Sequence, residues 1–264
     1  MTRRAQRYAI IPARMGSTRF PGKPLADLCG KPLVQHVVER ARDAAVFDEI
    51  IVATDDERIA GVVQRAGGRA KMTRADHGTG TERIAEVAAG LPASTLICNV
   101  QGDEPLLPVA LLRDLVHFME ADAGIEMATA AHPASDEAGL RSPHVVKVLL
   151  DRHGRALYFS RAAVPYAAGG ETRYLRHVGI YAFRAQALER IVALPPGDLE
   201  RREGLEQLRA LENGIPVDVL VTPHVTQGVD TPDDLKAVAS QLERFLESTP
   251  TKTPGSLSDS GCET

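Results

Sequence analysis

Residues 8–24 read YAIIPARMGSTRFPGKP, and residues 95–107 read TLICNVQGDEPLL. Each stretch begins as a short apolar run and ends in a polar loop that contains glycine and proline. The second run is apolar almost throughout, which is typical of a strand covered on both faces. Segments with apolar residues at helical spacing, such as Leu33–Ala41 and Ile59–Val63, alternate with the strand-like runs. This alternation predicts an α/β fold with a mostly parallel, doubly wound sheet.

The middle of the chain has a different pattern, because strand-like runs follow one another with little helical spacing between them. These runs are Met127–Ala131, Val145–Leu150, Ala156–Ser160 and Val178–Phe183. The turn sequence Asp151–Gly154 predicts a hairpin between the second and third runs. We therefore expect one domain over residues 7–247 with an antiparallel insert around 126–183. Residues 248–264 are rich in Ser, Thr, Pro and Gly, which predicts a disordered tail.

The composition excludes several classes of protein. The 264 residues carry a formal net charge of -4, so no global positive field exists to hold a nucleic acid. Cys29, Cys98 and Cys262 are too few and too widely spaced for a disulfide framework or a zinc site. No run approaches the roughly 18 to 20 apolar residues of a membrane span, and the N-terminus lacks the apolar region of a signal peptide. We expect a cytoplasmic protein with no nucleic-acid or membrane partner.

The loop after the first strand holds three cations, Arg14, Arg19 and Lys23, together with glycines and a hydroxyl. Its glycine spacing and the proline after Lys23 differ from a Walker A loop, and no GxGxxG pattern is present. Glycines still let backbone N–H groups approach phosphate oxygens, and the cations can neutralise a polyphosphate. A solvated basic loop is the alternative interpretation.

An acidic turn follows the strand at residues 95–100. Asp103 lies behind a glycine and ahead of Glu104 and Pro105, at the sheet edge that also carries the basic loop. Mg²⁺ needs few protein carboxylates when phosphates complete its coordination shell, which makes Asp103 a candidate ligand and Glu104 a weaker one. A turn carboxylate that bonds its own backbone is the structural alternative.

Seven segments of the chain, spread in order over about residues 7–245, carry a specific combination of motifs. They are RxxSxRxPxKPL (14–25), RADHGTGTER (74–83), NVQGDEPL (99–106), YFSR (158–161), RHVGIYAFR (176–184), LEQLR (205–209) and GVDTPDDL (228–235). Each motif alone is weak. Together they resemble the 3-deoxy-manno-octulosonate cytidylyltransferase family, whose members make CMP-Kdo.

The resemblance implies a nucleotidyltransferase fold of the sugar-nucleotide type and an Mg²⁺-dependent enzyme. The implied reaction joins CTP to 3-deoxy-manno-octulosonate (Kdo), giving CMP-Kdo and pyrophosphate, and the implied assembly is a homodimer that uses the antiparallel segment. Positions that match the nucleotide site are Arg14, Ser17, Arg19, Lys23, Arg74, Thr79 and Gln101. Asp103 and Asp230 match the Mg²⁺ carboxylates, and we expect Arg14, Lys23 and Asp103 to act in catalysis.

Five further positions match the sugar-acid pocket: Arg161, His177, Tyr181, Glu206 and Gln207. An ulosonic acid offers a carboxylate and several hydroxyls, which a guanidinium and hydroxyl or carboxylate partners can bind. Without the resemblance, His177 reads as a structural histidine, and Glu206 and Gln207 as the polar side of a helix.

The chain departs from the family pattern on the acceptor side. After YFSR the family commonly has Ile-Pro-Trp and a long charged loop, whereas this chain has Val164-Pro165-Tyr166 and nine residues, 167–175. The alternative reaction is therefore cytidylyl transfer to another small acid, such as a modified ulosonic acid or a phosphonate like phosphonoformate. A nucleotide sensor is disfavoured because the cations and carboxylates are kept, and a sugar-1-phosphate uridylyl- or thymidylyltransferase because its loop is richer in glycine.

Overall fold

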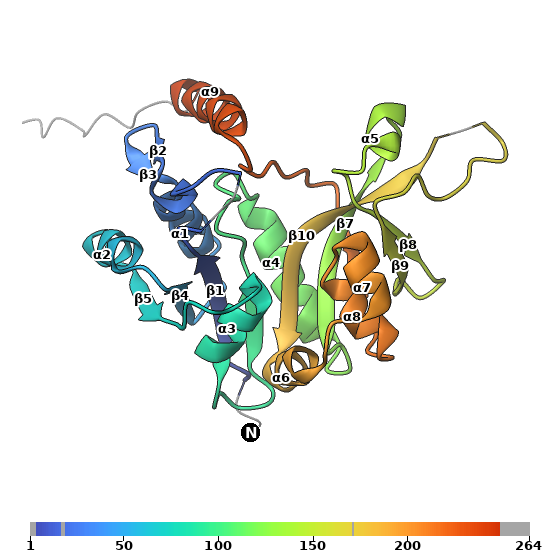
Figure 1. Cartoon of the computed structure of the whole chain (residues 1–264), viewed down its shortest axis with the longest axis horizontal. Coiled ribbons are helices and arrows are strands. Elements are labelled where there is room, and N and C mark those ends of the chain that lie inside the picture. The colour runs from blue at the N-terminus through green and yellow to red at the C-terminus, as the bar shows by residue number, and fades with distance from the viewer. Residues whose placement is uncertain (1–3, 17–18, 171, 249–264) are drawn as a thin grey trace, which may run out of the picture.

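The computed structural model describes residues 4–16, 19–170 and 172–248, without the side chains of 245–248. Within these residues the main sheet has nine strands (Figure 1). Seven of them form the order β11-β7-β10-β6-β1-β4-β5. Their bounds are β1 (Arg7–Ala13), β4 (Glu49–Thr54), β5 (Arg69–Met72), β6 (Leu96–Asn99), β7 (Met127–Ala134), β10 (Tyr174–Arg184) and β11 (Asp218–Val221). All neighbouring pairs are parallel except those that β10 makes with β6 and β7.

Helices cover both faces of this sheet, and the alternation of side chains along β1 divides the core between them (Figure 1). Ala9 and Ile11 pack on one side with α1 (Leu33–Asp43), α2 (Glu57–Arg65), α4 (Val109–Ala121) and α9 (Pro232–Ser248). Ile10 packs on the other side with α3 (Gly80–Ala88), α6 (Ala185–Ala193) and α8 (Gln207–Glu212). The predicted doubly wound α/β fold is confirmed.

Local sequence signals fix the start of two helices near the site. The Asp56 side chain accepts a hydrogen bond from the Arg58 N–H at 2.9 Å and caps α2. Thr79 caps α3 in the same way, because its hydroxyl accepts from the Glu82 N–H at 3.1 Å. Helix α1 begins directly after Pro32, and α4 directly after Pro108.

The middle of the chain contains the predicted hairpin, formed by β8 (Lys147–Leu150) and β9 (Ala156–Ser160). Strand β10 pairs antiparallel with both β7 and β8. Strand β7 belongs to the main sheet and runs parallel to β11, so the excursion from the sheet consists of β8, β9 and the β8-paired part of β10, where Leu175 pairs with Val148. The short helix α5 (Glu137–Arg141) lies between β7 and β8.

Several elements of the described residues were not predicted, among them β5, α3, α6, α7 (Asp198–Glu203) and the short pieces η1 (Lys23–Leu25), β2 (Asp27–Leu28) and β3 (Lys31–Pro32). The proposed tail falls almost wholly outside the described residues, which end at 248. Among the helices of the described ranges, none combines the length and apolar character needed to cross a membrane.

Candidate active site

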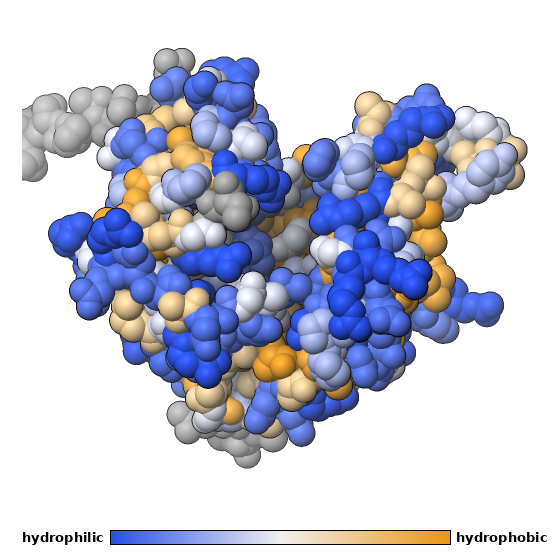
Figure 2. All heavy atoms as spheres, in the orientation of Figure 1, coloured by the Kyte–Doolittle hydropathy of each residue, from blue (hydrophilic) through white to orange (hydrophobic). Residues whose placement is uncertain are grey.

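The site lies at the carboxyl edge of the parallel strands, where β1 and β6 end side by side. The loop after β6 passes close to the end of β1 at Gly102. A Cβ atom at Gly102 would lie 2.6 Å from the carbonyl oxygen of Pro12, so only glycine fits there without a shift of the backbone. This close approach brings the basic loop and the acidic turn to one cavity. Figure 2 shows the hollow in the molecular surface, bordered by hydrophilic side chains.

The first cavity, which we call the donor cavity, has a volume of about 290 Å³. Seven residues predicted for nucleotide or metal binding line it: Arg14, Arg19, Lys23, Thr79, Gln101, Asp103 and Asp230. Three are cations and two are carboxylates, so both charges that a metal triphosphate requires are present. Ser17, the remaining predicted triphosphate residue, lies outside the described residues.

Lys23 holds the two acidic segments of the donor cavity together. Its Nζ donates to Asp103 Oδ2 at 2.6 Å and to the Val229 carbonyl at 2.7 Å, and lies 3.5 Å from Asp230 Oδ1. The Lys23 side chain is only 11% exposed. Arg19 Nη2 reaches Asp230 Oδ1 at 3.1 Å. Two carboxylates distant in sequence therefore converge on one cation.

The donor set fits Mg²⁺, because carboxylate oxygens are hard ligands. Within the described part of the chain no group of three or more His, Cys, Asp or Glu residues is arranged to hold a metal ion. Asp103 and Asp230 would thus need oxygen atoms of the triphosphate to complete a coordination shell. Glu104 does not line the donor cavity. Burial, aided by the charge of Asp103, raises the pKa of Glu104 to about 8, and its buried Oε2 has no hydrogen-bond partner.

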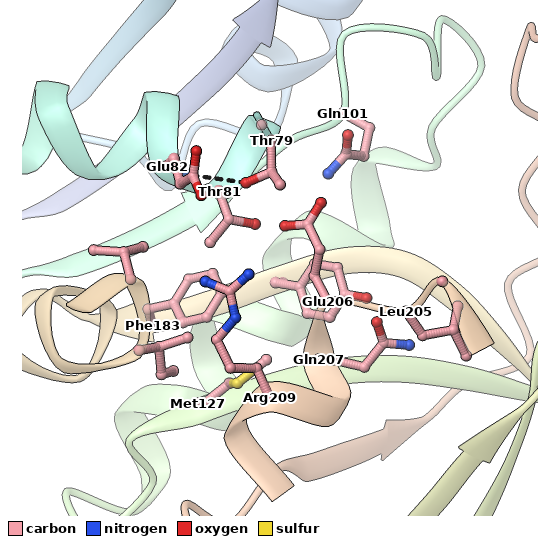
Figure 3. Close-up of a pocket in the computed structure, with 15 residues that line it drawn as sticks. Thr79, Thr81, Glu82, Gln101, Met127, Phe183, Leu205, Glu206, Gln207 and Arg209 are labelled. Carbon is pink, nitrogen blue, oxygen red and sulfur yellow. Dashed lines mark hydrogen bonds between the residues drawn. The ribbon is translucent and has the colours of Figure 1, made fainter. Parts of the chain in front are cut away.

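A second cavity of about 200 Å³, the acceptor cavity, adjoins the first (Figure 3). Thr79, Gly80 and Gln101 line both cavities and form their common wall. Tyr181, Glu206 and Gln207, three of the five residues predicted for the sugar acid, line the acceptor cavity. Figure 3 shows Glu206 and Gln207 on one side and Thr79 and Gln101 on the other.

The polar groups of the acceptor cavity sit in surroundings that oppose charge. Burial raises the pKa of Glu206, although hydrogen bonds from Thr81 and Thr79 lower it in part. Burial and the neighbouring Glu206 raise the pKa of the Tyr181 hydroxyl. The buried Nε2 of the Gln207 side chain has no hydrogen-bond partner among the described residues. A buried donor without a partner carries an energetic cost that a ligand oxygen can remove.

The cytidylyltransferase family profile matches residues 8–219. The 3-deoxy-manno-octulosonate cytidylyltransferase of Anaeromyxobacter sp. (strain Fw109-5) is 53% identical over 236 residues, which cover 88% of this chain and 95% of that protein. The enzyme of the same name from Syntrophobacter fumaroxidans is 49% identical over 238 residues, with 88% and 95% covered.

This chain belongs to the 3-deoxy-manno-octulosonate cytidylyltransferase family. A solved structure of CMP:2-keto-3-deoxy-manno-octonic acid synthetase complexed with CTP is 42% identical, with a TM-score of 0.87 over 91% of this chain and 100% of that one. A cytidylyltransferase from Leptospira borgpetersenii, 18% identical with a TM-score of 0.62, shows the shared fold only. The family and the nucleotidyltransferase fold predicted from the motifs are confirmed.

Two residues that the family motifs place in the acceptor pocket, His177 and Arg161, are not among the described residues that line the acceptor cavity. His177 lies beside it, with its Nε2 2.9 Å from Thr129 Oγ1 and its ring against Phe159 and Tyr181. Burial lowers the pKa of His177 to about 3, so the ring is neutral near pH 7. The Arg161 guanidinium donates to the carbonyls of Pro143, Glu203 and Gly204.

Three other arginines bear on the positions given by the family motifs. Arg74 is exposed, its Nε lies 3.3 Å from Asp76 Oδ1, and it does not line the donor cavity. Arg83 lines that cavity instead, fully buried, with Nη2 3.0 Å from Asp55 Oδ2. Arg209 lines the acceptor cavity and makes two hydrogen bonds to Glu200, at 2.8 and 2.6 Å.

A sequence signal existed for both missed arginines, because each falls on an apolar helical face. Arg83 precedes Ile84 and lies four residues before Val87, and Arg209 follows Leu205 by four residues. A charged residue on a buried stripe is rarely there without a partner.

Proposed function

We propose that this protein transfers the cytidylyl group of CTP to Kdo, forming CMP-Kdo and releasing pyrophosphate. One observation carries the proposal: a cavity rich in charge and a cavity of hydrogen-bonding groups share the wall of Thr79, Gly80 and Gln101. A triphosphate in the donor cavity and a sugar acid in the acceptor cavity would meet at that wall. The CTP-complexed synthetase, with a TM-score of 0.87, supports the assignment of the donor.

The reaction is an in-line attack of the anomeric hydroxyl of Kdo on the α-phosphorus of CTP, with pyrophosphate as the leaving group. Arg14, Arg19 and Lys23 bind the triphosphate and stabilise the charge that develops on the leaving oxygens. The protein supplies no nucleophile, so the reaction has no covalent enzyme intermediate. Mg²⁺, held by Asp103 and Asp230, would stabilise negative charge on the phosphates and lower the pKa of the attacking hydroxyl.

Acceptor binding falls to the groups of the second cavity. Glu206 accepts hydrogen bonds from sugar hydroxyls, and the unpartnered Nε2 of Gln207 donates to an acceptor oxygen. Because these groups are fixed at the start of α8, the sugar acid is oriented before it reaches the shared wall.

An acceptor panel tests the proposed function. Pyrophosphate release and product mass are measured with CTP alone, and then with Kdo, sialic acid and phosphonoformate. We expect no release with CTP alone and a CMP adduct with Kdo in equal amount to pyrophosphate. Faster turnover with phosphonoformate or sialic acid would show that this compound, and not Kdo, is the substrate. Omission of Mg²⁺ should abolish the reaction.

We also propose a homodimer that uses the face of the β8–β9 hairpin. Leu157 on β9 and Tyr166 in the following loop are 63% and 91% exposed. An open groove of about 620 Å³ lies in the same region, lined by Pro133, Val148, Leu150, Pro165 and Tyr174 among others. Light scattering of the wild-type protein and of Leu157→Glu tests this. A dimer that becomes monomeric in the variant supports the proposal, and a monomeric wild type refutes it.

We place the reaction in the cytoplasm, where CTP is made.

A further inference from the structure

Three ionised side chains form a cluster next to the acceptor cavity without lining it. They are Lys147 on β8, Arg161 directly after β9 and Glu203 at the end of α7. We call them the hairpin cluster. Their positions join the hairpin to the segment that carries Glu206 and Gln207. These two parts of the chain are far apart in sequence, since 42 positions separate Arg161 from Glu203.

Lys147 is fully buried, and its hydrogen-bonding capacity is used within the protein. Its Nζ donates to the carbonyls of Ser142 at 3.1 Å, Val145 at 2.7 Å and Arg161 at 2.7 Å. An ammonium has three protons, so none is left for a ligand. Lys147 therefore fixes the backbone at the start of β8 and at the end of β9.

Glu203 is the anion of the hairpin cluster. Its carboxylate accepts from the Ser160 hydroxyl at 2.7 Å and from the Arg161 N–H at 2.8 Å. The Arg161 Nε in turn donates to the Glu203 carbonyl at 2.7 Å, and its Nη1 donates to the Pro143 carbonyl at 2.9 Å. Glu203, the last residue of α7, is thus bound to the end of β9 through both its carboxylate and its backbone carbonyl.

The next residue, Gly204, connects the hairpin cluster to the acceptor cavity. It lies in the left-handed region with φ of 62°, ends α7, lines the acceptor cavity and offers its carbonyl to Arg161 Nη2 at 3.4 Å. Glu206 and Gln207 follow within three residues. Any shift of this turn would move both acceptor groups.

We propose that Lys147, Arg161 and Glu203 are positioning residues for the acceptor, which hold the turn at Gly204 so that Glu206 and Gln207 face the cavity. The inference rests on the proposed function of that cavity. A displacement near 1 Å is enough to reduce the use of a substrate by about 100-fold.

The test compares Glu203→Ala and Glu203→Gln with the wild type. The matched control is Glu126→Ala, which removes an exposed glutamate that pairs with Arg190. We expect the KM for Kdo to rise by about 10- to 100-fold in Glu203→Ala and by less in Glu203→Gln, whose amide oxygen still accepts hydrogen bonds. The KM for CTP should stay within about twofold in both, because the donor cavity is built from other segments. Glu126→Ala should match the wild type.

Two outcomes overturn the inference. An unchanged KM for Kdo, with or without a lower melting temperature, would leave Glu203 a stabilising residue only. Equal increases in the KM values for Kdo and CTP would show a general disturbance of the fold. If Glu203→Ala does not fold, Glu203→Gln decides by the same criteria. A wild-type protein that does not convert Kdo overturns the proposed function itself, which the wild-type assay reveals before any variant is measured.

Discussion

The donor and acceptor cavities share a wall but differ in the kind of side chain that lines them. The donor cavity collects the cations Arg14, Arg19 and Lys23 and the carboxylates Asp103 and Asp230 in a part of the molecule open to solvent. The acceptor cavity relies on buried hydrogen-bonding groups, and the one guanidinium among its described lining residues, that of Arg209, is paired with Glu200. The first can hold many charges, whereas the second recognises shape and hydroxyl groups.

The two cavities also differ in the part of the fold that supplies them. Loops after β1 and β6 form much of the donor cavity, and the close contact at Gly102 fixes them relative to each other. Strand β10 and the segment before α8 contribute to the acceptor cavity. Substitutions should therefore affect one substrate far more than the other, and the predictions below use this separation.

The largest effect is expected for Asp103→Asn. The substitution removes a charge from the predicted metal site with little change in volume, so kcat should fall on the order of 1,000-fold. Circular dichroism should show an unchanged fold, because Lys23 keeps its contact with the Val229 carbonyl. Near-normal turnover at saturating Mg²⁺ would remove Asp103 from the metal site.

A smaller and more selective effect is expected for Gln207→Leu. The buried Nε2 has no partner in the free protein, so its loss should not lower the melting temperature. The KM for Kdo should rise about 10-fold, because one hydrogen bond to the acceptor is lost. Gln186→Leu, at an exposed position of α6, is the control. A destabilised Gln207→Leu protein with an unchanged KM would show that Gln207 is structural.

Most residues of the donor cavity could be predicted from the sequence, but fewer of those of the acceptor cavity. The difference has a physical reason. Arg14 directly follows β1 and Asp103 lies shortly after β6, and the ends of neighbouring parallel strands meet at one edge. Their meeting could thus be predicted from strand order alone. Glu206 and Gln207 were placed by motif, since a polar pair beside Leu205 and Leu208 looks like any helix surface.

Arginines were the hardest residues to place. A long side chain can reach a cavity or turn to nearby carbonyls, and backbone position does not decide between these options. The Arg161 guanidinium donates to carbonyl oxygens, and Arg74 remains exposed. Arg83 and Arg209 line the cavities and are held there by buried ion pairs. Only the packed structure shows which carbonyl or carboxylate is within reach.

Acid should also lower the stability of the protein through His177, which lies beside the acceptor cavity. Burial lowers its pKa from the ordinary 6.5 to about 3, so the unfolded chain binds a proton in this range and the folded protein does not. Stability from this group is complete above pH 6.5 and is lost as the pH falls toward 3. Between pH 7 and 5 the free energy of unfolding should drop by about 2 kcal/mol from this group.

Urea unfolding at the two pH values measures this drop in the wild type and in His177→Gln. The variant should lose much of the pH dependence, because glutamine does not titrate. An equal pH dependence in the two proteins would mean that His177 is protonated in the folded state.

The smallest effect is expected for deletion of residues 249–264. This segment has few apolar residues. Its composition offers too little apolar surface to offset the entropy of ordering, so rate and melting temperature should not change. A melting temperature lower by several degrees would show that the segment packs on the domain.

The separation of donor and acceptor is tested most directly by one crossed measurement. The Kd for CTP, by calorimetry, and the KM for Kdo are determined for Arg14→Gln and Glu206→Gln. We predict a Kd for CTP raised about 10-fold or more in Arg14→Gln and unchanged in Glu206→Gln, which should instead raise the KM for Kdo by a similar factor. If each variant weakens CTP and Kdo equally, the two cavities do not bind separate substrates.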